Sequence, residues 1–120
     1  MTLRPKTMVV MIFDTDTDHI DILKRNIKKL EKCPAVSEIV TIPQVPNLEQ
    51  ELIRSCNIKT AAELLGSRSK KDFKRDLIRV TNLADRLRLR QFDIRLLWSE
   101  TPLAPYQDIE NQAWKVKLPN

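Results

Sequence analysis

The stretch MVVMIFDTDTDHIDILKRNI, residues 8–27, holds an apolar run that ends in aspartates and then changes to a helical pattern. The apolar run predicts a strand over residues Thr7 to Phe13 that is buried on both faces, as in a parallel sheet covered by helices. Asp14, Asp16 and Asp18 follow at alternate positions. Carboxylates crowded together repel one another unless a positive charge lies among them, so this strand end is the first candidate site.

Helical spacing begins directly after these aspartates. Four apolar residues recur at intervals of three and four, with basic residues between them: Ile20, Leu23, Ile27 and Leu30. This pattern predicts an amphipathic helix. Thr17 or Asp18 is expected to cap its first turn, because short oxygen-bearing side chains accept hydrogen bonds from the free N–H groups there.

Two further segments predict strands. Residues 36–42, VSEIVTI, form a short β-branched run, and residues 92–98, FDIRLLW, alternate apolar and polar positions. The order of elements predicts an α/β fold: a small, mainly parallel sheet of three to four strands flanked by helices. We expect residues 1–100 to form one α/β domain and residues 101–120 a C-terminal tail that packs on it.

Helices are predicted between the second and third strands. Asn47 is placed to cap a helix that begins LEQEL. Residues 60–65 predict a short helix that Gly66 ends. Residues 70–90 predict a longer helix with a break near Asn82, and Ser69 is placed to cap its start.

Composition narrows the functional class. The chain has 120 residues, and no apolar run approaches the length needed to cross a bilayer. Its single glycine, Gly66, excludes glycine-rich phosphate loops of the P-loop and dinucleotide-binding types. Cys33 and Cys56 stand in no metal-ligand spacing, which favours buried thiols in a reducing cytoplasm. We therefore expect a cytoplasmic protein with no membrane partner.

Charge is distributed unevenly. The net charge is +5, yet residues 67–95 alone hold ten basic residues against four aspartates, whereas residues 14–21 hold four aspartates and no lysine or arginine. Such a distribution suits a site that holds a cation and a polyanion together, and it favours nucleic acid as the partner. The alternative interpretation of the basic segment is a solvated helix face.

The aspartates and a later glutamate are candidate metal ligands. Chemistry in open α/β sheets gathers at the carboxyl ends of strands, where Asp14 and Asp16 stand. Glu49 follows the second strand and is expected at the same edge of the sheet. Hard carboxylate oxygens suit Mg²⁺ or Mn²⁺. The alternative is that these acids only favour the starts of helices.

The segment SRSKKDFK, residues 67–74, is a candidate phosphate site. Basic side chains at a helix start bind phosphate through charge and backbone N–H groups. The candidate nucleic-acid-binding residues are Arg68, Lys70, Lys71, Lys74 and Arg75. A lysine close to a reacting phosphate also stabilises developing negative charge. The alternative is again a solvated helix start.

The order of these motifs resembles the Toprim fold of topoisomerases, primases and the overcoming-lysogenization-defect nucleases. The resemblance covers about residues 8–75: FDTDTD is similar to the Asp-x-Asp strand end of that family, NLEQEL to its later glutamate, and SKKDFK to its lysine segment. It implies that Asp14, Asp16 and Glu49 hold the metal and that Lys70, Lys71 and Lys74 are catalytic. The glutamate that the family carries on an earlier strand is absent, because no acid precedes Asp14.

Two functions follow as expectations. The first is a metal-dependent nuclease-like or phosphoryl-transfer domain that acts on nucleic acid. The second is a non-catalytic regulatory module with a degenerate Toprim-like fold that binds nucleic acid or protein, in a phage or mobile-element setting. A thin sheet also leaves strand edges exposed, so we expect a homo-oligomer or a partner chain to complete the sheet or the site.

Overall fold

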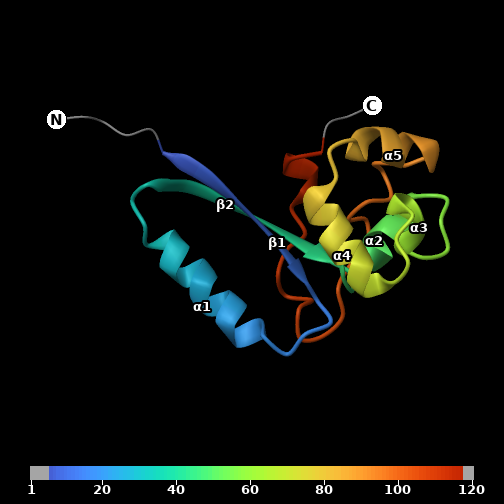
Figure 1. The fold of residues 1–120 in the computed structure, drawn as a ribbon. Coiled ribbons are helices and arrows are strands. Elements are labelled where there is room, and N and C mark those ends of the chain that lie inside the picture. The colour runs from blue at the N-terminus through green and yellow to red at the C-terminus, as the bar shows by residue number, and fades with distance from the viewer. Residues whose placement is uncertain (1–5, 118–120) are drawn as a thin grey trace. The chain divides into compact units, whose positions relative to one another are not determined.

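The computed structural model describes residues 6–117, which form two compact units. Unit 1 contains the described residues up to Pro46 and again those from Glu100 onward. Unit 2 contains residues 47–99. The chain therefore leaves unit 1 after the second strand, builds unit 2, and returns to unit 1 for its last segment (Figure 1).

Unit 1 is built on a parallel pair of strands. β1 (Thr7–Asp14) pairs with β2 (Val36–Gln44), and α1 (Ile20–Glu31) connects them. A parallel pair needs such a crossover, because a tight hairpin turn joins only antiparallel strands. The α/β class and the parallel pairing are confirmed, but the described residues form a sheet of two strands and not the expected three to four.

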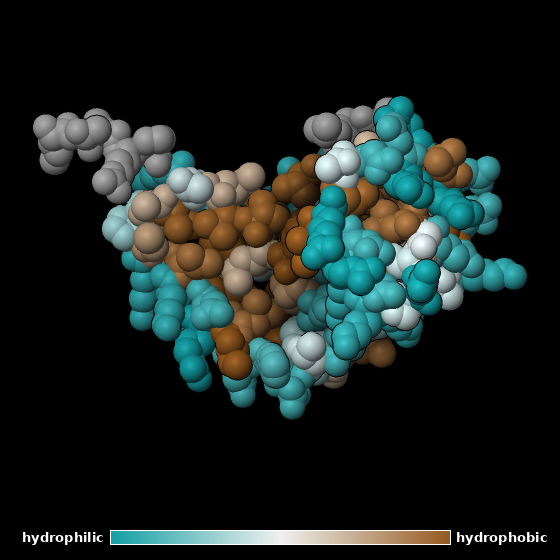
Figure 2. Space-filling model, viewed as in Figure 1, coloured by the Kyte–Doolittle hydropathy of each residue, from teal (hydrophilic) through white to brown (hydrophobic). Residues whose placement is uncertain are grey.

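Burial in unit 1 is uneven between the strands. β2 is buried from Val40 to Gln44, whereas no residue of β1 is buried. Met8, Val10 and Ile12 are 48%, 38% and 48% exposed. Figure 2 shows hydrophobic side chains gathered on the surface over the strands of unit 1. The expectation that the apolar run is buried on both faces is therefore wrong for the described residues.

The C-terminal segment supplies part of the core of unit 1. Tyr106 is 1% exposed, its ring lies 6.1 Å from that of Phe13, and its hydroxyl donates a hydrogen bond to the Thr17 carbonyl at 3.0 Å. Gln112 bonds both backbone groups of Thr41 in β2, at 2.8 Å and 3.0 Å. A 3₁₀ helix follows at Ala113–Lys115. This segment therefore covers part of the outer edge of β2.

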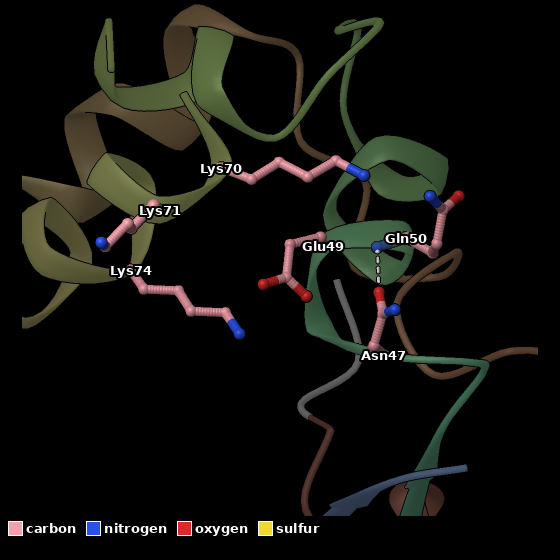
Figure 3. Close-up of a pocket in the computed structure, with 6 residues that line it drawn as sticks. All are labelled: Asn47, Glu49, Gln50, Lys70, Lys71 and Lys74. Carbon is pink, nitrogen blue, oxygen red and sulfur yellow. Dashed lines mark hydrogen bonds between the residues drawn. The ribbon is translucent and has the colours of Figure 1, made fainter. Parts of the chain in front are cut away.

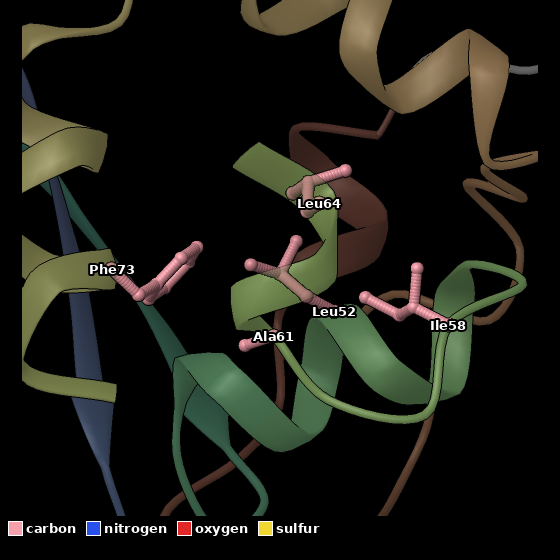
Figure 4. Close-up of a cluster of buried hydrophobic side chains, with 5 residues drawn as sticks. All are labelled: Leu52, Ile58, Ala61, Leu64 and Phe73. Atoms are coloured by element: carbon pink, nitrogen blue, oxygen red, sulfur yellow. The ribbon is translucent and has the colours of Figure 1, made fainter. Parts of the chain in front are cut away.

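Unit 2 is helical. Its helices are α2 (Leu48–Ser55), α3 (Ala62–Leu65), α4 (Lys70–Arg79) and α5 (Leu83–Leu89). Its core is a cluster of buried apolar side chains, shown in Figure 4: Leu52, Ile58, Ala61, Leu64 and Phe73. Within residues 6–117, no helix combines the length and the apolar character needed to cross a bilayer.

The helix boundaries follow the sequence signals closely. Gly66 ends α3 in the left-handed conformation with φ 68°, which glycine adopts without steric cost. The expected long helix is broken between Arg79 and Leu83. The cap expected for α1 differs: His19 precedes the helix and makes no capping side-chain bond. The Thr17 hydroxyl instead accepts the His19 N–H at 3.4 Å and lies 2.9 Å from the Tyr106 hydroxyl.

Residues 94–98 form turns and residues 92–93 belong to no helix or strand, so the expected third strand is wrong. The Asp93 carboxylate accepts the Arg95 N–H at 3.0 Å, a local bond that competes with extended backbone. Trp98 has φ 56°, and its N–H donates to the Glu51 carboxylate at 2.9 Å. These bonds satisfy backbone groups that a strand would present to a neighbouring strand. The alternating pattern of side chains in the sequence gives no sign of these bonds.

Candidate nucleic-acid interface

An open pocket of about 350 Å³ lies in unit 2 between the first turns of α2 and α4. It is called here the lysine pocket, and its lining residues are Asn47, Glu49, Gln50, Lys70, Lys71 and Lys74. Figure 3 shows the Lys70 and Lys74 side chains reaching from α4 toward the start of α2, with the Glu49 side chain between them, whereas the Lys71 side chain points away from α2. The structure thus brings Glu49 together with the three lysines that the sequence singled out.

Capping residues fix both helix starts at this pocket. The Asn47 side chain accepts a hydrogen bond from the Gln50 N–H at 3.0 Å, and the Ser69 hydroxyl accepts one from the Asp72 N–H at 3.2 Å. Both caps were expected from the sequence. The first turn of a helix carries the positive end of the helix dipole, so two such ends face the pocket and favour an anion there.

The lysines of the pocket are exposed. In the described part of the chain, none of Lys70, Lys71 and Lys74 forms an ion pair, and neither does Glu49. Lys70 and Lys71 stand in the first turn of α4, where the dipole disfavours a cation. Helix stability therefore does not account for these lysines.

The two candidate arginines differ in their surroundings. Arg75 lies 3.5 Å from the Asp72 carboxylate and 3.2 Å from that of Asp76, so part of its charge is compensated. Arg68 is exposed just before the Ser69 cap and does not line the pocket. The Ser67 hydroxyl, which donates to Asp76 at 2.6 Å, and the neighbouring Arg75 lower the pKa of the Asp76 carboxyl.

The candidate metal ligands divide between the units. Asp14 and Asp16 belong to unit 1 and Glu49 to unit 2, so no one unit contains all three. Among residues 6–117, no group of three or more histidine, cysteine, aspartate or glutamate side chains is arranged to hold a metal ion. A metal site therefore stays a prediction that rests on the chemistry of the residues.

The turn after β1 shows why its aspartates alternate with threonines. Thr15 donates to the Gln44 carbonyl at 2.8 Å, and Thr17 is bound by Tyr106. The threonines hold the turn to unit 1, while Asp14, Asp16 and Asp18 are exposed. Asp14 also accepts a hydrogen bond from the Gln44 side chain at 3.0 Å, across the paired ends of β1 and β2.

Several residues of these sites were not singled out from the sequence. Gln44 is opposite Asp14 in the strand register, and Gln50 lines the lysine pocket. The alignment of two parallel strand ends is the signal that identifies Gln44. Tyr106 lies far along the chain from the Thr17 that it binds, and no local pattern marks that contact.

Comparison with protein-family models, curated proteins and solved structures gives no match for this chain. The Toprim resemblance accordingly remains a prediction that rests on the motifs FDTDTD, NLEQEL and SKKDFK. The geometry of each unit is the basis for the function proposed below.

Proposed function

We propose that this protein binds the phosphate backbone of nucleic acid through the lysine pocket. The observation that carries the proposal is the convergence of two capped helix starts and three lysines without ion-pair partners on one pocket. Phosphate oxygens would accept hydrogen bonds from the lysines and favour the positive ends of the helix dipoles. Contacts of this kind hold the backbone without reading sequence.

The surrounding charge supports the same proposal. Residues 67–95 carry ten basic residues against four aspartates, a local excess larger than the net charge of the whole chain. Arg68 and Arg75 extend the basic surface along the chain on either side of Lys70, Lys71 and Lys74. A backbone that lies in the pocket therefore meets further positive charge in the same segment.

Binding of labelled oligonucleotides at several salt concentrations tests this proposal. Replacement of Lys70, Lys71 and Lys74 by glutamine should weaken binding at least about tenfold and reduce the slope of log K against log salt by about 3. The control replaces Lys28, Lys29 and Lys32 by glutamine, which removes the same charge from exposed positions in unit 1. Equal losses in both triple variants would show nonspecific attraction and contradict the pocket.

A second candidate is metal-dependent, nuclease-like phosphoryl transfer with Lys70, Lys71 and Lys74 facing the phosphate. It is favoured by the position of Asp14 at the carboxyl end of a parallel strand, with Asp16 exposed in the turn after it. These carboxylates supply the hard oxygens that Mg²⁺ and Mn²⁺ take, commonly with waters. A bound ion would neutralise phosphate charge and activate a water.

Glu49 distinguishes the two candidates. If the pocket binds phosphate directly, Glu49→Gln should strengthen binding in the presence of a chelator, because the carboxylate repels the phosphate. If Glu49 instead shares a metal ion with the phosphate, the same variant should bind more weakly in Mg²⁺ or Mn²⁺. Oligonucleotide binding by the wild type and by Glu49→Gln, each with chelator and with metal, decides between them.

A further inference from the structure

The outer edge of β1 is open over its whole length in the part of the chain that the structure describes. The N–H groups of Thr7 and Thr15 bond to Ala35 and Pro46, on the side of β2. Backbone direction alternates along a strand, so Met8, Val10 and Ile12 point their N–H and C=O groups away from β2. Such an edge is a template for another strand.

The same residues present an apolar face. Met8, Val10 and Ile12 are the exposed side chains of an alternating pattern, and Val9, Met11 and Phe13 are half-buried. Monomeric proteins protect strand edges with charged residues, proline or bulges. Residues 7–13 contain no charged residue, proline or glycine, so β1 lacks this protection. The outer edge of β2 differs, because Gln112 occupies both backbone groups of Thr41.

We infer that this edge pairs with β1 of a second copy of the chain, antiparallel about a twofold axis at Val10. In that register Met8 lies opposite Ile12 of the other copy, and Val10 lies opposite Val10. The outward backbone groups of these residues then form the hydrogen-bonded pairs of an antiparallel ladder. The two strands of each copy join into one continuous sheet.

Charge selects a second copy as the partner and fixes the register. Lys6 and Asp14 flank the apolar residues at the same alternate positions, and both are exposed. Pairing about Val10 places Lys6 of each copy opposite Asp14 of the other, so that opposite charges meet at both ends. A shift by two residues would instead oppose Met8 to Asp14 or Lys6 to Ile12. A strand with this pattern is therefore complementary to itself.

Exchange of the flanking charges tests the pairing. Lys6→Asp leaves only acids at both ends of the paired edge, and Asp14→Lys leaves only bases, so each variant alone should raise the dimer dissociation constant by about tenfold or more. An equimolar mixture should recover dimers, because every cross-strand pair is again of opposite charge. Sedimentation velocity over micromolar concentrations measures all three samples and the wild type.

Two substitutions by lysine distinguish association through the β1 edge from association through exposed apolar residues elsewhere. Val10→Lys sets like charges against each other at the twofold axis and should give a monomer, with helical circular dichroism unchanged. Ile78→Lys changes another exposed apolar residue, 85% exposed in unit 2, and should leave the dimer intact. Dimers in Val10→Lys, or no recovery in the mixture, would overturn the inference.

The wild type alone also gives a decisive result. A protein that stays monomeric at every concentration would overturn the inference. Hydrogen exchange on such a monomer would then show what covers the edge: protected amides at Met8, Val10 and Ile12 would mean that another segment of the same chain does. Association only with added protein of other kinds would likewise count against a second copy.

Discussion

Lysine is an unfavourable residue for the first turn of a helix, and α4 carries two there. Lys70 and Lys71 stand at the positive end of the helix dipole, and Lys74 stands one turn further along. Asp72 in the same turn is the kind of residue that this position favours. The lysines are thus costly for helix stability.

Lys70→Gln and Lys71→Gln should therefore stabilise the protein while they weaken nucleic-acid binding. We expect each to raise the free energy of unfolding by about 0.3–1 kcal/mol at low salt. Urea denaturation measures the change. Lys28 and Lys29 stand in the last turn of α1, where the helix dipole favours cations. Lys28→Gln and Lys29→Gln should therefore lower the free energy of unfolding. Destabilisation by the α4 variants would show that these lysines serve the fold.

The Ser67–Asp76 hydrogen bond makes part of the stability depend on acid pH. It is the main cause that lowers the pKa of Asp76 from its ordinary value of 3.8, so the folded state prefers the ionised carboxylate. Its contribution is therefore complete above about pH 3.8 and is lost as the pH falls through the lowered value. The melting temperatures of the wild type and Ser67→Ala should differ at neutral pH and converge in acid. A constant difference across this range would contradict the assignment.

At the scale of elements, Glu51 links α2 to the turns of residues 94–98. Its side chain is fully buried, lies 2.7 Å from the Arg54 guanidinium, and accepts the Trp98 N–H. The carboxylate ties a helix to a segment that forms no regular structure of its own.

Loss of this carboxylate should destabilise unit 2 strongly. We expect Glu51→Ala to lower the free energy of unfolding by about 3 kcal/mol, because it removes the buried carboxylate that pairs with Arg54 and accepts the Trp98 N–H. Glu51→Gln keeps an acceptor for Trp98 and should cost less. Urea denaturation followed by circular dichroism compares the two. Equal losses would show that the negative charge itself, and not the accepted backbone bond, is what matters.

Local patterns predict the elements of this chain well, because periodicity and capping depend on neighbouring residues. The runs that became β1, α1 and β2, the Asn47 and Ser69 caps, and the end of α3 at Gly66 were all expected. Long-range bonds override local patterns elsewhere. Residues 92–98 alternate as a strand does, yet Asp93 and the distant Glu51 hold residues 94–98 in turns.

The candidate site was predictable to the same extent. Glu49 and Lys70, Lys71 and Lys74 each stand out at a helix start, and both helix starts follow from their caps. Their arrangement around one pocket depends on how α2 and α4 pack on the core around Leu52 and Phe73. That packing involves residues distant in the chain, which a pattern of neighbours does not specify.

At the scale of the whole molecule, the acidic and basic segments belong to different units. The four aspartates of residues 14–21 lie in unit 1, and the basic excess of residues 67–95 lies in unit 2. Binding of a cation by the aspartates and binding of a polyanion by the lysines can therefore be tested separately. The side chains of one segment can be replaced without direct damage to the unit that holds the other.

Addition of Mg²⁺ or Mn²⁺ tests the cation at the aspartates. If Asp14 and Asp16 hold a metal ion, free metal at ten times its dissociation constant should stabilise the protein by about 1.4 kcal/mol. Thermal unfolding measures this shift, and Asp14→Ala with Asp16→Ala should abolish it. The matched control, Asp18→Ala with Asp21→Ala, removes the same charge nearby and should retain the shift. No shift in the wild type would contradict a metal at this turn.

The return of the chain to unit 1 imposes an order on synthesis. Every residue of unit 2 emerges from the ribosome before Tyr106 and Gln112, the residues that complete unit 1. The helical unit can therefore fold early, while β1, α1 and β2 wait for their last packing partners. During that interval the contacts of Tyr106 and Gln112 with unit 1 are not yet formed. A ribosome that stalls within residues 100–106 would therefore leave β1 and β2 accessible to chaperones and proteases.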